Sequence, residues 1–152
     1  MSPQIATNTQ VDLADLLEFV EARHHVVLVT TRADGSPQLS PVSAGVDEGR
    51  IVIATYPERA KVHNLRRFPE ASLLVLSDDW NGAWVQVDGT AEVLDAPASI
   101  EPLVGYYRCI SGEHPDWEEY REAMVRQGKS LIRITPLRWG PVATGGFPAH
   151  LA

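Results

Sequence analysis

Short β-rich segments separated by turn signals limit what this chain can fold into more than any other feature of its sequence. Segments 26–31, 37–46 and 50–55 are rich in β-branched residues, and the turn signals RADGS and DEG separate them. Such short connections join antiparallel neighbours, so we predict three antiparallel strands. Further strands are predicted at 71–77, 83–95 and 130–139. Six antiparallel strands favour a small closed barrel, because closure removes exposed strand edges.

A barrel of this size has an interior filled by side chains, which leaves little room there for a ligand. We therefore expect the functional site outside the barrel, in a groove or between subunits. In the fifth predicted strand, Trp84 and Gln86 alternate with Val85 and Val87, so one face of this strand points to the core and the other does not. Gly89 in the same strand predicts a bulge or a close approach of another backbone.

Four helices are predicted around the strands. The first covers 11–23, where leucines recur with helical spacing after Asp12, a residue suited to the N-cap. The second is the short segment ERAKVHNLRR, closed by Pro69. The other two cover ASIEPLVGYYRCI and DWEEYREAMVRQG. Asp116 is expected to cap the last of them.

The chain has 152 residues, a length usual for one hydrophobic core, so we predict a single domain over 1–152. Residues 1–10 and 141–152 are expected to form tails. The sequence leaves open whether the second tail is flexible or folds over the site.

The stretch YPERAKVHNLRRFPEA, residues 56–71, concentrates positive charge in an acidic chain. The formal net charge is −7, yet four of the thirteen Lys and Arg residues lie within nine positions. They are Arg59, Lys61, Arg66 and Arg67. Nucleic-acid binders usually carry a broad basic face, which this composition does not supply, so no nucleic-acid partner is expected. One local cluster indicates a small anion instead.

The basic cluster lies where a predicted strand leads into a predicted helix. A helix start offers free backbone N–H groups and a positive dipole end, and Arg59 and Lys61 add full charges that can reach the same anion. We leave Arg66 and Arg67 out of the site, since consecutive helical positions point in different directions and these two fit a solvated helix face.

Other patterns exclude several classes of site and partner. No apolar run reaches the roughly 20 residues of a bilayer span, and the N-terminal MSPQIATNTQ lacks the features of a secretion signal, so we expect a cytoplasmic protein without a membrane partner. The single Cys109 permits neither an internal disulfide nor a CxxC metal site. The histidines show no HxxxH or HExxH spacing, so no metal is expected.

Three segments, taken in order, resemble one known family. DGSPQLSPVSAGVDEGRIVIATYPERAKVHNLRRFPEASLLV, VQVDGTAEVLD and YYRCISGEHPDWEEYREAMV resemble the flavin and deazaflavin oxidoreductases of the pyridoxamine 5'-phosphate oxidase-like split β-barrel superfamily, and most of all its coenzyme F420-dependent branch. The resemblance implies a mainly β fold with flanking helices: a six-stranded antiparallel split β-barrel of the FMN-binding kind. It also implies a homodimer with two cofactor sites at the subunit interface.

The resemblance also implies which residues bind the cofactor. Arg59 and Lys61 would hold its phosphate, with Asn64 as a further polar anchor or a helix-positioning residue. Thr55 and Tyr56 would line the ring or its linker. Contacts with the isoalloxazine-like ring are assigned to Ser40, Pro41 and Val42, and contacts across the dimer interface to Trp84 and Gln86. Trp84, together with Trp80, can equally serve interface packing without touching a cofactor.

In such a protein the cofactor ring supplies the hard chemistry, so no catalytic triad is required. The resemblance implies hydride transfer between coenzyme F420 and a small conjugated or unsaturated substrate, with Tyr56 or solvent as the candidate proton donor and no other catalytic residue assigned. The first alternative is an FMN-dependent enzyme of the pyridoxamine-phosphate-oxidase type. The second is a non-catalytic protein that binds a cofactor or a tetrapyrrole such as haem. The substrate and the direction of hydride transfer stay open.

Overall fold

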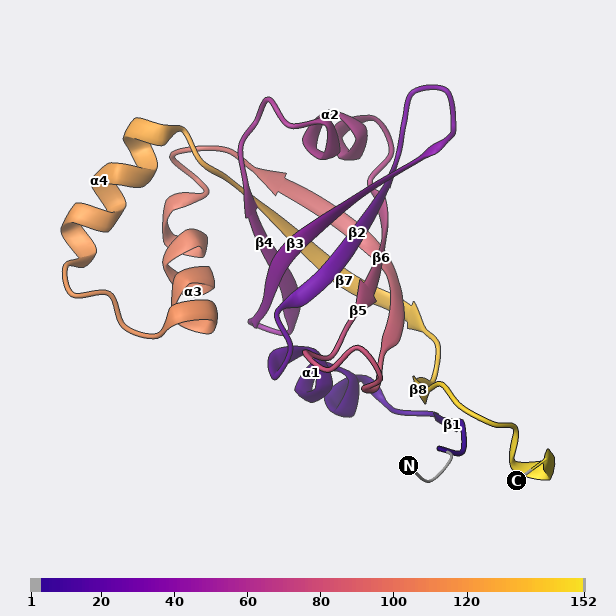
Figure 1. Ribbon diagram of the computed structural model, residues 1–152. Helices are drawn as coiled ribbons and strands as arrows, with labels where there is room; N and C mark the ends of the chain where they lie inside the picture. The colour runs from indigo at the N-terminus through magenta and orange to yellow at the C-terminus, as the bar shows by residue number, and fades with distance from the viewer. Residues whose placement is uncertain (1–3, 152) are drawn as a thin grey trace.

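The computed structural model describes residues 4–151 of the chain. Its centre is a closed antiparallel barrel in which the strands follow the order β2-β3-β4-β7-β6-β5 (Figure 1). The strands are β2 His25–Thr31, β3 Pro37–Asp47, β4 Arg50–Thr55, β5 Glu70–Val75, β6 Val85–Leu94 and β7 Ser130–Trp139. This confirms the predicted fold class, a mainly β chain built on a six-stranded antiparallel barrel.

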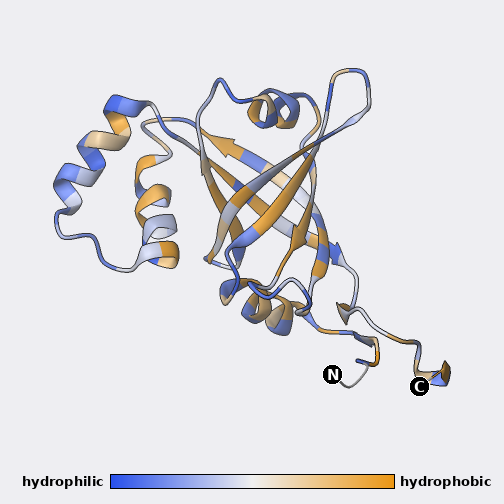
Figure 2. Ribbon diagram, in the orientation of Figure 1, coloured by the Kyte–Doolittle hydropathy of each residue, from blue (hydrophilic) through white to orange (hydrophobic). Residues whose placement is uncertain are grey.

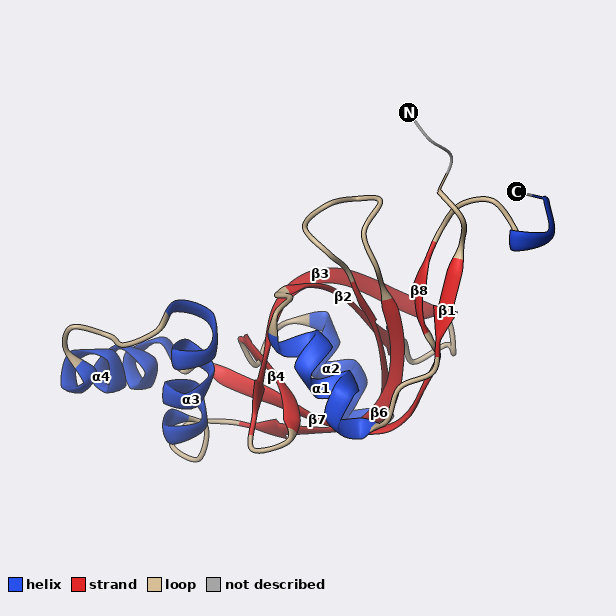
Figure 3. Ribbon diagram, turned by 90° about the horizontal axis from the view of Figure 1, so that it is seen from below, coloured by secondary structure: helices blue, strands red, loops and turns tan. Residues whose placement is uncertain are grey.

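All of the predicted helices are present in the described part of the chain. They are α1 Leu13–Glu21, α2 Ala60–Arg67, α3 Ile100–Ser111 and α4 Trp117–Gln127. In Figure 1, α1 and α2 lie at opposite ends of the barrel, and in the view along the barrel in Figure 3 both lie over its opening. The α3–α4 hairpin stands to one side, where α3 packs against β3 and β4. Within residues 4–151, no helix is long and apolar enough to cross a bilayer.

Side chains fill the barrel interior, as expected. The fully buried residues include Leu28, Ile53, Val87 and Ile134, one each from β2, β4, β6 and β7. Leu16 of α1 and Leu65 of α2 belong to the same hydrophobic cluster, so each helix closes one end of the barrel. Figure 2 shows hydrophobic residues running along the barrel strands and hydrophilic ones along much of α4. A ligand therefore has to bind outside this core.

Two local predictions for α1 and β6 are confirmed. Asp12 caps α1 by accepting a hydrogen bond of 2.8 Å from the backbone N–H of Asp15. The β6–β7 ladder shifts register between Asp88 and Gly89. A Cβ atom at Gly89 would lie 2.4 Å from the backbone oxygen of Thr135. Gly89 thus marks both a bulge and a close backbone approach.

The barrel is split where β3 and β4 part. Their ladder pairs only residues 44–47 of β3 with residues 50–53 of β4. Beyond it, β3 runs on beside β2, whereas Thr55 at the end of β4 pairs with Ser130 of β7. The chain then turns from β4 into α2. This divergence places the segment that carries the basic cluster at the α2 end of the barrel (Figure 1).

The described parts of the two expected tails lie beside each other. The short strand β1 Thr7–Thr9 pairs antiparallel with β8 Val142–Thr144. A bridge between Trp84 and Ala143 attaches this pair to the start of β6. A 3-10 turn, Ala149–Leu151, ends the described chain. We call the β1–β8 pair and the residues that follow β8, up to Leu151, the terminal arm. The terminal arm projects from the α1 end of the barrel, away from α2 (Figure 1).

Candidate cofactor site

The start of α2 is open to an anion. Arg59 occupies the N-cap position, but its side chain makes no capping hydrogen bond, and the first turn contains no acidic residue. The backbone N–H groups of Val62 and His63 both point to the carbonyl oxygen of Arg59, at 3.0 and 3.3 Å. Within the described chain, no protein atom accepts from the backbone N–H groups of Ala60 and Lys61. These two donors remain available to a bound anion.

Positive charge gathers at the same place without an ion-pair partner. None of the ion pairs within residues 4–151 involves Arg59, Lys61 or Lys129. Lys61 is partly buried, and its pKa is lowered, first by desolvation and then by the positive charge of Arg59. A cation held in this way has lost hydration and gained no carboxylate. An anion bound beside it would compensate for both losses.

Tyr56 connects the start of α2 to the end of α4. The guanidinium carbon of Arg59 lies 5.8 Å from the centre of the Tyr56 ring, and the Lys129 ammonium lies 5.5 Å from it. The Tyr56 hydroxyl donates a long hydrogen bond of 3.4 Å to Oε1 of Gln127. We call Arg59, Lys61 and Lys129 the cation group. The structure thus brings the predicted residues Tyr56, Arg59 and Lys61 together at one end of the barrel.

Sequence reasoning missed Lys129 and Gln127. Both lie just before β7, and Ser130 of β7 pairs with Thr55 at the end of β4. Residue 129 is therefore brought to residue 56 by the pairing of β4 with β7, two strands far apart in the chain. Lys129 could have been found only from a prediction of which strands are neighbours in the barrel.

Both the nitrogen and the oxygen of the Asn64 side-chain amide form hydrogen bonds within the protein. Its Nδ2 donates to Oγ1 of Thr30 at 3.0 Å, and its Oδ1 accepts from Arg67 at 3.3 Å. The residue is only 3% exposed. Thr30 in turn donates to Gln38, which continues the connection to β3. Of the two roles considered for Asn64, this geometry favours the one that fixes α2 on the barrel.

The three residues predicted along β3 divide between its two faces. Val42 packs against the barrel core, and Ser40 lies on the same inward side, because side chains two apart on a strand share a face. Oγ of Ser40 is buried and has no hydrogen-bond partner in the described chain. Pro41 is exposed on the outward side. A ring lying on the outer surface of β3 would therefore meet the side chain of Pro41 and only the backbone of its neighbours.

Pro41 and Gln86 lie in one row across the outer face of the barrel. The row runs from Pro41 to Val27, from Val27 to Leu74, and from Leu74 to Gln86, through three strand pairings. We call the outward surface of β3, β2, β5 and β6 the outer face. Leu39, on the same side of β3, is 59% exposed. A shallow hollow of about 300 Å³ lies on this face, with Pro41 and Val27 in its wall.

Trp84 lies at the other end of the barrel from the cation group. It precedes β6 beside the projecting arm, whereas Arg59 and Lys61 lie at α2 (Figure 1). Trp84 is 40% exposed, and Gln86 beyond it is exposed and donates to Asp88 at 3.3 Å. Within one chain, the structure does not bring these two residues to the cation group.

The described residues give no sign of a metal site or a reactive thiol. No group of three or more His, Cys, Asp or Glu side chains within residues 4–151 could hold a metal ion. The Cys109 thiol donates to the backbone oxygen of Val46 at 2.9 Å, and burial followed by the negative charge of Asp47 raises its pKa. A thiol with a raised pKa is a poor nucleophile at neutral pH.

A family model described as pyridoxamine 5'-phosphate oxidase matches residues 13–143. A conserved hypothetical protein from Mycobacterium tuberculosis has 23% identity over 93% of this chain and 89% of its own, with a TM-score of 0.75. An F420 reductase has 18% identity over 80% and 93%, with a TM-score of 0.62. A heme storage protein from Vibrio cholerae has 17% identity over 89% and 95%, with a TM-score of 0.61. At such identities these solved structures support the fold alone.

Proposed function

The chain belongs to the pyridoxamine 5'-phosphate oxidase family, and from that premise we propose that it is an oxidoreductase that holds the phosphate of a flavin-type cofactor at the start of α2. The observation that carries this proposal is the cation group, whose three members have no carboxylate partner within residues 4–151. The free N–H groups of Ala60 and Lys61 suit the same phosphate. A structural role accounts for Arg59 and Lys129, which lie over the Tyr56 ring, but not for the desolvated Lys61.

Coenzyme F420 is the cofactor that we propose, with FMN as the alternative. A single phosphate is satisfied by Arg59, Lys61 and the helix start. Lys129 extends the positive charge beyond them, past the Tyr56 ring toward the end of α4. F420 carries an oligoglutamate tail beyond its phosphate, whereas FMN ends there. A third cation at that position therefore favours the longer, more acidic cofactor.

Bound in this way, the deazaflavin ring would supply the hydride chemistry with a small conjugated or unsaturated substrate. The chain's own part is to hold the phosphate, to orient the ring and to provide or relay a proton. Tyr56 is the candidate donor, because its hydroxyl makes one long bond to Gln127 and can turn to a substrate instead. No nucleophile from the chain is required.

Titration of the protein with each cofactor tests this proposal. We expect F420 to bind with a stoichiometry of one per chain, and FMN to bind more weakly because it leaves Lys129 without an anion. Isothermal titration calorimetry at low salt measures both affinities. A tighter complex with FMN would transfer the proposal to the alternative cofactor, and tight binding of haem in place of either would favour the non-catalytic alternative.

A homodimer completes the proposed site. The middle of the outer face carries Pro41, Val27 and Leu74, whereas its β6 edge carries the polar Gln86 and Asp88. Both ends of the row, Pro41 and Gln86, are exposed in one chain. A two-fold axis that lies in this face, perpendicular to the barrel axis, would reverse the barrel direction between protomers. The cation group of one protomer would then approach Trp84 and Gln86 of the partner subunit, which lie at the opposite end of their own barrel.

Replacing Leu39 by Asp is expected to weaken the dimer by at least 10-fold, because it buries a charge in the proposed interface. Leu39 is 59% exposed in one chain, so the change should not disturb the fold. Sedimentation equilibrium of the wild type and the variant measures the dissociation constant. Leu137→Asp is the matched control, since Leu137 is 66% exposed on β7, outside the outer face. A wild-type protein that sediments as a monomer would contradict the proposed interface.

A further inference from the structure

Tyr106 of α3 reaches the place where β3 and β4 part. Its hydroxyl donates to the backbone oxygen of Ser43 at 3.1 Å. Burial raises the pKa of Tyr106, and a hydrogen bond with the backbone of Ala54 acts in the opposite direction. A bond that lowers the pKa of a hydroxyl is donated to its oxygen, so the N–H of Ala54 is the donor. One hydroxyl thus connects β3 to β4 directly beyond their last pair.

The register of the two strands shows what this hydroxyl replaces. β3 and β4 are joined by the two-residue loop 48–49, so the pair that closes the loop is hydrogen-bonded. Hydrogen-bonded pairs alternate with non-hydrogen-bonded ones along an antiparallel ladder. The ladder contains four pairs, and the fifth, Ser43 with Ala54, would be hydrogen-bonded again. The Tyr106 hydroxyl bonds to both of these residues, in the place of their direct bonds.

The close contact between α3 and β3 fixes the direction from which Tyr106 arrives. A Cβ atom at Gly45 would lie 2.8 Å from Cβ of Cys109, and one at Gly105 would lie 3.0 Å from the carboxyl carbon of Asp47. Gly105 and Cys109 lie on either side of Tyr106 along α3. The tyrosine is therefore held on a helix that packs tightly against the strand it bonds to.

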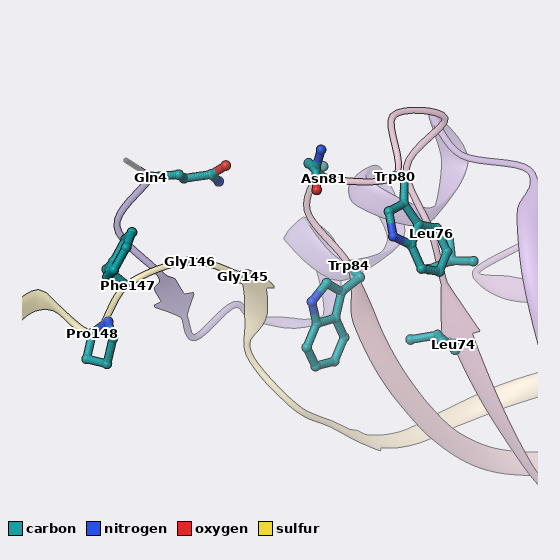
Figure 4. A pocket seen from close by; sticks show the side chains of 11 residues that line it. Gln4, Leu74, Leu76, Trp80, Asn81, Trp84, Gly145, Gly146, Phe147 and Pro148 are labelled. Atoms are coloured by element: carbon teal, nitrogen blue, oxygen red, sulfur yellow. The ribbon is translucent and has the colours of Figure 1, made fainter. Parts of the chain in front are cut away.

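The cofactor site proposed above spans the opening between β3 and β4. Its phosphate lies at the start of α2, after β4, whereas its ring lies on the outer face beside Pro41. The shallow hollow on that face also has Ser43 in its wall. A larger pocket of about 780 Å³ has Trp84 and Phe147 in its walls (Figure 4). It lies beside the terminal arm, so within one chain the hollow at Ser43 is nearer to the start of α2.

We propose that Tyr106 is a positioning residue, whose hydroxyl takes the place of the next β3–β4 pair and so sets the distance between the phosphate and the ring of the bound cofactor. The inference rests on the proposed function and deepens it, because it states how one chain spaces the two ends of its cofactor. Without the hydroxyl, the Ser43 oxygen and the Ala54 N–H can bond to each other. The opening would then narrow, and the two ends of the cofactor would no longer fit their places together.

Two probes test this role in the variant Tyr106→Phe by isothermal titration calorimetry. F420 occupies both ends of the proposed site, whereas inorganic pyrophosphate occupies only the end at α2. We expect F420 binding to weaken by about 5-fold or more and pyrophosphate binding to stay within about 2-fold of the wild type, because only the spacing is lost. The urea midpoint should change little, since the two backbone groups freed by the substitution pair with each other.

Tyr120→Phe is the matched control for a purely structural loss. The Tyr120 hydroxyl donates to the backbone oxygen of Leu103 at 3.0 Å, within the α3–α4 hairpin. Its removal leaves a buried acceptor without a partner, so the urea midpoint should fall while both affinities stay unchanged. If Tyr106→Phe behaves like this control, or weakens both probes equally, Tyr106 has only a structural role and the proposal is overturned.

A crystal structure of Tyr106→Phe without cofactor tests the geometry directly. We expect the backbones of Ser43 and Ala54 to be hydrogen-bonded to each other. Strands that stay as far apart as in the wild type would overturn the proposal. The proposed function fails separately: a wild-type protein that binds neither F420 nor pyrophosphate would reject the phosphate site itself. Wild-type binding of both probes, with equal F420 affinity in Tyr106→Phe, would reject only the role of Tyr106.

Discussion

Replacing Lys61 by Ala is expected to weaken F420 binding about 10- to 100-fold, which corresponds to about 1–3 kcal/mol for the loss of a charge-assisted hydrogen bond. Lys61 is partly buried beside Arg59 and has no carboxylate partner within residues 4–151. Its ammonium group is therefore expected to contact the cofactor phosphate directly. Calorimetric titration of the wild type and the variant measures the change, and circular dichroism checks that the fold is retained.

Arg66→Ala is the matched control for this prediction. Arg66 lies on the same helix but forms an ion pair with Asp95, so its loss should change F420 affinity less than 2-fold. An equal loss of affinity in the two variants would indicate a general effect of net charge. Wild-type affinity in Lys61→Ala would contradict the site assignment.

The pH dependence of binding gives a second readout of Lys61. Its pKa is lowered from the ordinary value of 10.5, chiefly by desolvation. Phosphate binding favours the protonated ammonium. The affinity for F420 is therefore highest while Lys61 is charged, and it falls as the pH rises through the lowered pKa of Lys61. The decline should therefore begin at a lower pH than an ordinary lysine would cause. Lys61→Arg should abolish this decline, because arginine stays protonated throughout the range.

Replacing Gly89 by Ala is expected to destabilise the fold by about 1–3 kcal/mol, the usual cost of forcing an extra group into a packed site. The new Cβ atom would lie 2.4 Å from the backbone oxygen of Thr135 and 2.9 Å from a side-chain carbon of Ile134. Because backbone gives way less easily than a flexible side chain, the β6–β7 ladder would have to move. Urea unfolding monitored by circular dichroism measures the loss.

Gly140→Ala is the control for the glycine prediction. An added Cβ atom at Gly140 meets nothing within 4 Å, and the residue does not have positive φ. Its free energy of unfolding should therefore stay within about 0.5 kcal/mol of the wild type. Equal stability of the Gly89 and Gly140 variants would mean that the bulge adapts, and that the close approach at β6 does not constrain the sequence.

The barrel could be predicted from the sequence because each of its strands has a local signal. Alternation of Val85 and Val87 with polar neighbours, and turn residues between short β-rich runs, depend only on adjacent positions. The short strands β1 and β8 carry no such signal. Their pairing joins Thr7 to Thr144, across nearly the whole chain, and three residues are too few to show a period.

The candidate site was predictable only where it is local. Arg59 and Lys61 follow a strand and begin a helix, which is a short-range pattern. Lys129 reaches them only because β4 pairs with β7, and the sequence does not reveal that pairing. The resemblance assigns Ser40 and Pro41 to the same ring, whereas neighbouring residues on a strand face opposite sides. Long-range pairing and side-chain direction were the missing information.

The central claim is that the cation group at the start of α2 holds the cofactor phosphate. A crystal structure of the protein grown with F420 tests it most directly. We expect the phosphate within hydrogen-bond distance of the Arg59 and Lys61 side chains and of the free N–H groups at the start of α2, with the ring extending along the outer face. A well-defined F420 molecule whose phosphate lies elsewhere, with Arg59 and Lys61 in contact only with solvent, would contradict the claim.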